Sequence, residues 1–271
     1  MSFLGLFKKK LHKPGIPEVA GMHIPTAHLN ALQPSDQFLI SYPRSGNTWM
    51  RNLLKDVIIL SRPDLPQDVH PDHLLPDIHQ GGPAHPAQQQ FGMQSRILKS
   101  HNIRDIHSHR AVYLFRTAAD SLLSYYHFGI LRRQPWIIEG ETADDFCRRF
   151  LPTWDVHMRI ALEMHIASPA RVHFVSYERL LADGLHELRR VVDFYGLIAT
   201  DETLTAATER NSFEKLRARE QQRVPDAKGF FYRKGREGSA REELSAATVE
   251  FLENATHAAH AQARQFATPR S

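Results

Sequence analysis

Short apolar runs alternate with helical periodicity along this chain. Apolar runs that end in polar or turn residues are typical of buried strands, and they occur at Gln37–Pro43, Arg96–His101, Ala111–Arg116 and Arg171–Glu178. Apolar spacings of three and four residues predict helices at Asn47–Leu60, Ala118–Ile130, Thr142–Ile166, Leu185–Tyr195, Thr203–Leu216 and Glu242–Ala263. Strands that alternate with helices favour βαβ units. We therefore expect an α/β fold with a central parallel β-sheet flanked by helices.

The pattern also divides the chain into a leading segment and one domain. Residues 1–36 are rich in proline and glycine and lack periodicity, so they are interpreted as an N-terminal lead-in. The alternating pattern predicts a single α/β domain over residues 37–271. Repeated prolines exclude a long helix in residues 61–90. Long loops in compact domains are often functional, so this loop is a candidate cover for a binding site.

Charge and cysteine content narrow the classes of function. The 271 residues carry 34 Lys+Arg and 30 Asp+Glu, and the resulting charge of +4 suits an anionic small ligand but is too weak to indicate nucleic-acid binding. One cysteine, Cys147, cannot form an intramolecular disulfide, and no apolar run approaches membrane-spanning length. We expect a cytoplasmic protein. Residues 1–10 leave open a weak contact with an anionic membrane surface, although a frayed terminus is the simpler interpretation.

The strongest chemical signal is the segment SYPRSGNTW at Ser41–Trp49, between the first strand and its helix. Gly46 permits a tight backbone, and the helix start offers unpaired N–H groups and the positive end of its dipole. The guanidinium of Arg44 suits phosphate oxygens. Further polar donors come from Ser45, Asn47 and Thr48. The sequence therefore predicts a P-loop-like phosphate-binding loop after the first strand.

Two other interpretations of this loop stay open at this point. An ATP-dependent small-molecule kinase would share the strand–loop–helix arrangement, but the loop lacks the lysine of the nucleotide-triphosphate motif and no magnesium aspartate is evident. A non-catalytic nucleotide-binding protein on the same fold is the other possibility.

The loop resembles that of the soluble sulfotransferases that use 3′-phosphoadenosine 5′-phosphosulfate (PAPS). Their motif YPKSGTTW is similar to YPRSGNTW at Tyr42–Trp49. Further segments resemble the same family in the same order, over roughly residues 36–240. They are LKSHN at Leu98–Asn102, FRTAADSLLSYYHF at Phe115–Phe128, VSYERLL at Val175–Leu181, NSFEKLR at Asn211–Arg217 and FFYRKGREGS at Phe230–Ser239.

The resemblance implies roles for particular residues. His101 would be the base that takes the proton of an acceptor hydroxyl, which suits a side chain that titrates near neutral pH. Lys99 and Arg44 would stabilise charge on the sulfuryl group and on the leaving phosphate. Ligands of the 5′-phosphosulfate would include Arg44, Ser45, Gly46, Asn47 and Thr48. The 3′-phosphate would contact Arg116 and Ser124, and from the opposite side Arg233, Lys234 and Gly235. The adenine would contact Trp49, Tyr177, Ser212 and Phe213.

The chain departs from the family pattern in two places. Arg44 stands where relatives carry lysine, and arginine stabilises charge but does not donate a proton in practice. Ser239, Ala240 and Arg241 follow Gly238 where relatives have Asp-Trp-Lys, which leaves the usual dimer contacts in doubt. Asp120 is expected to act structurally near its helix start.

The predicted function is PAPS-dependent sulfuryl transfer by in-line attack, without a metal. The acceptor would present a hydroxyl, or an amine, on a small molecule, a sugar or a lipid. From their positions alone, Phe91, Phe128, Trp136 and Phe146 are candidate walls of the acceptor pocket.

Overall fold

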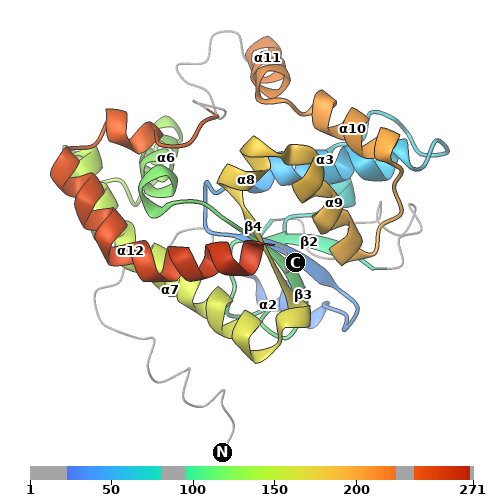
Figure 1. Ribbon diagram of the computed structural model, residues 1–271, viewed down its shortest axis with the longest axis horizontal. Coiled ribbons are helices and arrows are strands. Elements are labelled where there is room, and N and C mark those ends of the chain that lie inside the picture. Colours follow the sequence, from blue (N-terminus) through green and yellow to red (C-terminus); the bar gives the residue numbers. More distant parts are fainter. Residues whose placement is uncertain (1–22, 81–94, 224–234, 269–271) are drawn as a thin grey trace, which may run out of the picture.

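A parallel β-sheet lies at the centre of the molecule (Figure 1). The computed structural model describes residues 23–80, 95–223 and 235–268. Its strands are β1 (Gln37–Ser41), β2 (Ile97–Ser100), β3 (Arg110–Phe115) and β4 (Val172–Ser176). They pair in the order β2-β1-β3-β4, and every pairing is parallel. The predicted sheet and its strands are confirmed, with ends that differ by a residue or two.

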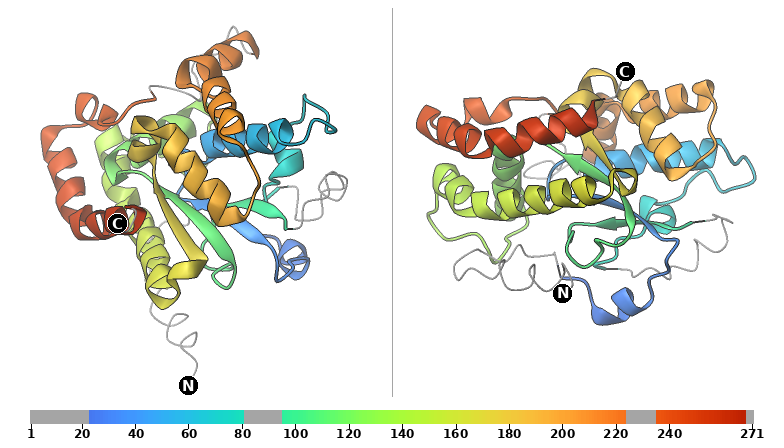
Figure 2. Two further views of the ribbon diagram at one scale, coloured as in Figure 1. Left: turned by 45° about the vertical axis from the view of Figure 1, so that its right-hand side comes forward. Right: turned by 60° about the horizontal axis from the view of Figure 1, so that its bottom comes forward.

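Helices cover both faces of this sheet. Figure 1 shows α6 (Ala118–Leu131), α7 (Ala143–Ala167) and α12 (Ala246–Ala267) to one side of it. On the other side lie α3 (Asn47–Leu60), α8 (Tyr177–Ala182) and α9 (Gly184–Tyr195). In both views of Figure 2, α12 lies along α7. The remaining described helices are α2 (Thr26–Asn30), α4 (Pro71–Leu74), α10 (Asp201–Arg210), α11 (Phe213–Arg223) and the 3₁₀ turns η1 (Pro169–Arg171) and η2 (Ser239–Glu242).

Alternating side chains of the strands pack into two separate apolar cores, one on each face of the sheet. Phe38 and Ile40 of β1 pack into the core that contains Trp154 of α7. Leu39, between them, points to the opposite face and packs with Met50 of α3. Every residue of β1 is buried, which is why this strand reads as a continuous apolar run. None of the helices in the described parts of the chain is long and apolar enough to cross a lipid bilayer.

The helix predicted at Thr203–Leu216 is wrong, because the chain forms two helices there. α10 ends at Arg210 and α11 begins at Phe213. The buried Asn211 lies between them, and its side-chain amide donates to Asp56 Oδ2 at 2.6 Å and to the carbonyl of Ala207 at 2.9 Å. These contacts hold Asn211 as a corner against α3 and interrupt the helix.

Two further boundaries differ from the prediction. β4 ends at Ser176, whose hydroxyl accepts from the N–H of Arg179, so Tyr177 begins α8 and does not extend the strand. Within the predicted lead-in, Ile24 is buried, and Asp36 accepts from Arg96 at 2.7 and 2.5 Å. The described residues 23–36 therefore pack on the sheet. Residues 1–22, which include the predicted membrane contact, lie outside the described part.

The carboxyl ends of all the strands meet at one edge of the sheet. Ile40 pairs with Ser100, Ser41 with Leu114, and Phe115 with Ser176. The residues that leave the strands at this edge are those of the phosphate loop, His101, Arg116 and Tyr177. Ligands of open parallel sheets bind at this edge, so the fold gathers the predicted site residues where a ligand is expected.

Candidate active site

A cavity of about 690 Å³ opens at the carboxyl edge of the sheet. Its volume lies in the range of small-molecule sites. The predicted residues that line it are Arg44, Gly46, Asn47, Thr48, Trp49, Lys99, His101, Arg116, Ser124, Tyr177, Phe213 and Gly235. Ser45 and Ser212 are not among its lining, and Arg233 and Lys234 lie outside the described residues. The structure thus brings together, around one cavity, segments that are far apart in the sequence.

The phosphate loop forms one wall of this cavity. Gly46 adopts φ 102°, a left-handed conformation that glycine tolerates best, and an added Cβ there would lie 2.7 Å from Cδ2 of Tyr177. Gly46 is the N-cap of α3 and offers no side chain to the free N–H groups of the first turn. Those groups, with the helix dipole, form a cradle for an anion.

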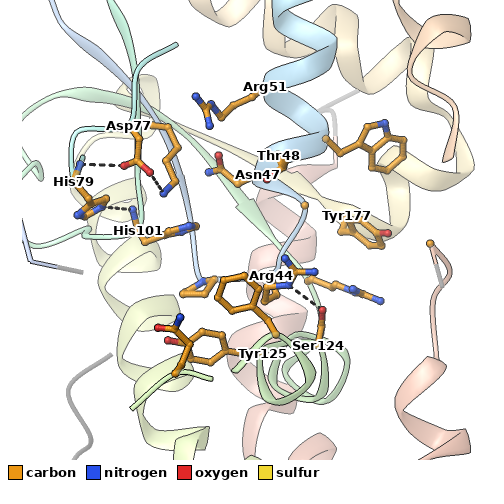
Figure 3. Close-up of a pocket in the computed structure, with 18 of the residues that line it drawn as sticks. Arg44, Asn47, Thr48, Arg51, Asp77, His79, His101, Ser124, Tyr125 and Tyr177 are labelled. Carbon is orange, nitrogen blue, oxygen red and sulfur yellow. Dashed lines mark hydrogen bonds and ion pairs between the residues drawn. The ribbon is translucent and has the colours of Figure 1, made fainter. Parts of the chain in front are cut away.

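Arg44 connects this loop to α6. Its Nε donates to Ser124 Oγ at 3.2 Å (Figure 3). Its guanidinium carbon lies 5.2 Å from the centre of the Phe128 ring. Arg44 itself adopts φ 69°, which is uncommon for a residue other than glycine. The guanidinium predicted to bind the 5′-phosphosulfate thus lies beside the Ser124 hydroxyl, which is predicted to contact the 3′-phosphate.

Two predicted donors of the loop turn their side chains inward. Ser45 Oγ lies 3.3 Å from Ser121 Oγ, and Ser45 is fully buried. The amide Nδ2 of Asn47 donates to Ser41 Oγ at 3.1 Å and, at 3.4 Å, to the carbonyl of Leu39. These contacts give both side chains a structural role in shaping the loop, and their contact with a ligand stays a prediction.

Arg116 provides the second cationic wall. One of its terminal nitrogens, Nη2, donates to the carbonyl of Arg236 at 3.0 Å and lies 3.4 Å from Asp120 Oδ2. Its Nε is buried and has no hydrogen-bond partner among the residues that the structure describes. A buried donor left unpaired costs about 1–3 kcal/mol. An anionic oxygen bound here would remove that cost, so the site fits a phosphate.

Asp120 fastens the 238–240 segment to α6. This carboxylate is almost fully buried and accepts from the N–H of Gly238 at 2.8 Å, the hydroxyl of Ser239 at 3.0 Å and the N–H of Ala240 at 2.8 Å. The structural role predicted for Asp120 therefore has a specific form. It holds the chain that follows Gly235 against the helix that carries Ser124.

Replacing Asp120 by asparagine is expected to lower the free energy of unfolding by about 2 kcal/mol, because the amide keeps only one of the two accepting oxygens. Urea unfolding followed by circular dichroism measures this loss. Asp193→Asn is the matched control, because Asp193 is exposed on α9, and the substitution should change stability by less than about 0.5 kcal/mol. Equal stability of the Asp120 variant and the parent would contradict this fastening role.

Aromatic side chains form the end of the cavity that lies opposite His101 (Figure 3). The rings of Trp49 and Tyr177 meet edge to face at 5.7 Å, and Trp49 Nε1 donates to the carbonyl of Asn211 at 2.8 Å. Gly235, with φ 61°, lies so close to Phe213 that an added Cβ would be 2.0 Å from Cδ2 of that ring. This end presents flat apolar surfaces of the kind that bind a nucleobase. Ser212 instead accepts from the N–H of Lys215 at 3.4 Å and caps α11.

His101 follows β2, and its ring is held in one tautomer. Its Nδ1 lies 2.7 Å from the carbonyl oxygen of Ser41. Because a carbonyl only accepts, Nδ1 carries the hydrogen and Nε2 keeps its lone pair. Burial is the main cause that lowers the pKa of His101 well below 6.5, and the charge of Lys99 adds to it. His101 is therefore neutral at physiological pH, with a basic nitrogen at the cavity.

Lys99 extends from β2 into the same part of the cavity. Its Nζ lies 2.7 Å from Asp77 Oδ2, and both side chains are about nine-tenths buried. Burial lowers the pKa of Lys99, and the carboxylate of Asp77 opposes that effect. The side chain of Lys99 thus lies at the cavity as the sequence predicts, where its amino group forms an ion pair with Asp77.

Sequence reasoning missed several residues of this site. Asp77, His79 and Arg51 all line the cavity (Figure 3). Arg51 extends from α3, and its Nε donates to the carbonyl of Leu75 at 3.1 Å. The only signal for Asp77 and His79 was their place in the histidine-bearing loop at 61–90.

The structure confirms only some of the residues that were predicted to line the acceptor pocket. Phe128 and Trp136 line the cavity, and Tyr125 stacks on Trp136 at 5.3 Å. Phe146 is completely buried against Phe150 and does not line the cavity, so that expectation is wrong. Phe91 lies outside the described residues. Within the described ranges, no three His, Cys, Asp or Glu side chains are grouped to hold a metal ion.

Comparison with known proteins agrees with this site. A family model described as the Sulfotransferase domain matches residues 34–264. Human Sulfotransferase 1C2 is 25% identical over 201 residues, which cover 68% of this chain and 67% of that protein. Flavonol 3-sulfotransferase of Flaveria bidentis is 25% identical over 235 residues, which cover 76% of this chain and 75% of that protein.

Solved structures share the fold at lower identity. Mouse sulfotransferase SULT7A1 complexed with PAP is 18% identical with a TM-score of 0.62, over 87% of this chain and 88% of that one. Retinol dehydratase in complex with androsterone and inactive cofactor PAP is 19% identical with a TM-score of 0.64, over 84% and 81% of the two chains. The likeness places the parallel sheet and its flanking helices in the same arrangement.

Proposed function

This chain belongs to the sulfotransferase domain family, and we propose on that premise how its residues share the work of moving a sulfuryl group from PAPS to a hydroxyl. The activity predicted from the sequence, PAPS-dependent sulfuryl transfer, is confirmed by the family, and the kinase alternative is not favoured. The residue roles and the acceptor that follow are our proposal.

The donor lies between the two cationic walls of the cavity. Arg44 and the first turn of α3, which begins after Gly46, bind the phosphosulfate end. Arg116, with its unpartnered Nε, binds the 3′-phosphate, and Ser124 contributes a hydroxyl to the same region. The adenine lies against the rings that line the far end, which are those of Trp49, Tyr177 and Phe213.

His101 acts as the general base. The acceptor oxygen forms a bond to sulfur as the bond from sulfur to the bridging phosphate oxygen breaks, and Nε2 of His101 takes the hydroxyl proton. Negative charge then develops on the departing adenosine 3′,5′-bisphosphate. Arg44 and Lys99 stabilise that charge electrostatically, without proton transfer from Arg44. Positioning and charge stabilisation together supply the catalysis.

The acceptor is a small molecule that carries a hydroxyl. Its side of the cavity has an apolar wall with Phe128 and Trp136 and a polar wall with His79 and Gln80. We propose that a ring system packs on the first wall while polar substituents face the second. Retinol and androsterone, named in the complexes of retinol dehydratase, are molecules of this size. Sugar or lipid acceptors and a cytoplasmic location stay predictions.

One observation carries the proposal: a histidine with a free Nε2 and an arginine with an unpartnered Nε line the same cavity. Isothermal titration is expected to show adenosine 3′,5′-bisphosphate binding at least about a hundredfold more tightly than ATP with magnesium, since only the bisphosphate has a 3′-phosphate for Arg116. Equal affinities would argue for a kinase. Sulfur-labelled PAPS with a panel of phenols, sterols and sugars then identifies the acceptor class.

A further inference from the structure

A short segment at the end of the described residues 23–80 pairs with the outer edge of β2. We call Pro76–His79 the strap. The N–H of Lys99 donates to the carbonyl of Pro76 at 2.9 Å, and the N–H of Ile78 donates to the carbonyl of Lys99 at 3.1 Å. Asp77 thus forms a parallel bridge with Lys99. The strap therefore pairs with the strand that carries Lys99, one of the two proposed catalytic cations, and that leads directly to the base, His101.

Asp77 holds the side chain of Lys99 from this strap. Its Oδ2 accepts from Nζ at 2.7 Å, while its Oδ1 accepts from the N–H of His79 at 3.0 Å. The second bond fixes the carboxylate in place. The N–H of His79 therefore orients the carboxylate of Asp77, and this carboxylate in turn orients the ammonium group of Lys99.

His79 holds the backbone of His101 from the same strap. Its Nδ1 lies 2.9 Å from the carbonyl of His23, so Nδ1 carries the hydrogen and Nε2 accepts. That Nε2 receives the backbone N–H of His101 at 2.9 Å (Figure 3). The two rings are nearly parallel, at 17°, with centres 6.3 Å apart. His79 thus fixes the main chain of His101 and covers one side of its ring.

Other elements fix the remaining polar groups of His101. Ser41 of β1 binds its Nδ1, and His157 of α7 has Nε2 3.1 Å from its carbonyl. The titratable and charged groups around His101 are therefore Lys99, His79 and His157, and those around His79 are Asp77, Lys99 and His23. Among the described residues, only the strap supplies an acceptor for the N–H of His101.

We propose that Asp77 and His79 are positioning residues for sulfuryl transfer: His79 holds the base, and Asp77 holds Lys99 as an ammonium ion at the cavity. The inference rests on the proposed roles of His101 and Lys99. A protonated His79 could not accept the N–H of His101, and burial lowers the pKa of His79, which keeps it neutral.

The first test is His79→Phe, which retains an aromatic ring but removes the acceptor. Loosening of His101 admits water, so we expect its pKa to rise toward 6.5 by about half a pH unit or more. NMR of histidine-labelled protein measures that pKa, with the resonance identified by its loss in His101→Gln. We expect kcat to fall roughly tenfold to a hundredfold, while the KM for PAPS changes less than about twofold.

Rescue and control variants separate positioning from packing. His79→Gln keeps an oxygen acceptor and an N–H donor, and we expect it to restore the parent pKa of His101 and most of kcat. His107→Phe alters a partly buried histidine beyond β2 whose Nδ1 contacts the carbonyl of Arg104, and it should change neither the pKa of His101 nor kcat. An unshifted His101 in folded His79→Phe, or a glutamine variant as impaired as the phenylalanine one, overturns the role of His79.

The second test is Asp77→Asn, which also serves if His79→Phe does not fold. Loss of the carboxylate charge lowers the pKa of Lys99 further, so the alkaline limb of kcat/KM should move to lower pH by about one unit. Asp105→Asn, an exposed carboxylate beyond β2, should leave that limb in place. If the alkaline limb of the pH profile of kcat/KM stays at the parent pH in Asp77→Asn, the proposed role of Asp77 is overturned. The NMR measurement needs no turnover, so it tests the positioning role of His79 even if the protein does not transfer a sulfuryl group. Failure of the positioning role and failure of the proposed function therefore give different results.

Discussion

His101→Ala is expected to lower kcat for sulfuryl transfer by about 10³-fold, because no other described side chain presents a free basic nitrogen where His101 Nε2 lies. The affinity for adenosine 3′,5′-bisphosphate should stay within about twofold, since the proposed phosphate ligands come from other segments. Labelled PAPS measures turnover, and isothermal titration measures binding. A variant that retains a tenth of parental turnover would remove His101 from the role of base.

The pH dependence of the parent provides an independent check. The base works as neutral imidazole, and burial with the charge of Lys99 lowers its pKa well below 6.5. Activity should therefore persist as the pH falls through 6.5 and be lost only at a lower pH, where Nε2 becomes protonated. His257→Ala, at an exposed histidine of α12, should reproduce the parent profile. An acid limb at or above pH 6.5 would contradict the buried, neutral base.

Arg116→Ala is expected to weaken adenosine 3′,5′-bisphosphate by about a hundredfold and adenosine 5′-phosphate by less than about threefold. The difference arises because a guanidinium–phosphate contact has charge-assisted hydrogen bonds, each of about 1.5–3 kcal/mol, and only the bisphosphate has a 3′-phosphate. Asp120 keeps its donors from Gly238, Ser239 and Ala240, so the fold should survive. Titration of both nucleotides measures the selectivity.

Arg110→Ala is the matched control for this prediction. Arg110 begins the strand that ends just before Arg116, and its guanidinium lies over the ring of Phe194, far from the carboxyl edge. Its loss should affect neither nucleotide. If Arg116→Ala weakens the binding of both nucleotides equally, the arginine shapes the cavity but does not bind the 3′-phosphate.

Local patterns predicted the sheet and the phosphate loop, and the family resemblance supplied most of the other predicted residues that line the cavity. The strands could be read because burial on both faces makes them continuous apolar runs, and the phosphate loop because glycine and an adjoining helix start stand together at Gly46 and Asn47. Whether a side chain of that loop points inward is decided by distant partners. Ser45 meets Ser121 of α6, which no local pattern reveals.

The features that the sequence did not reveal depend on long-range contacts. Asn211 interrupts a helical pattern because its amide reaches Asp56 on α3. Asp77 and His79 stand in a stretch that shows no periodicity, and their contacts with Lys99 and His101 form only when the strap reaches β2. A histidine bound to a backbone N–H leaves no spacing signature, so only the structure separates His79 from the other histidines of its loop.

The strap also bears on how copies of this protein behave toward one another. β2 is an outer strand of the sheet, and exposed outer strands tend to recruit strands from neighbouring molecules. Pro76 and Ile78 occupy the outward N–H and carbonyl of Lys99, so part of that edge is closed to self-association. Proteolytic nicking within the strap would therefore favour aggregation as well as slow turnover.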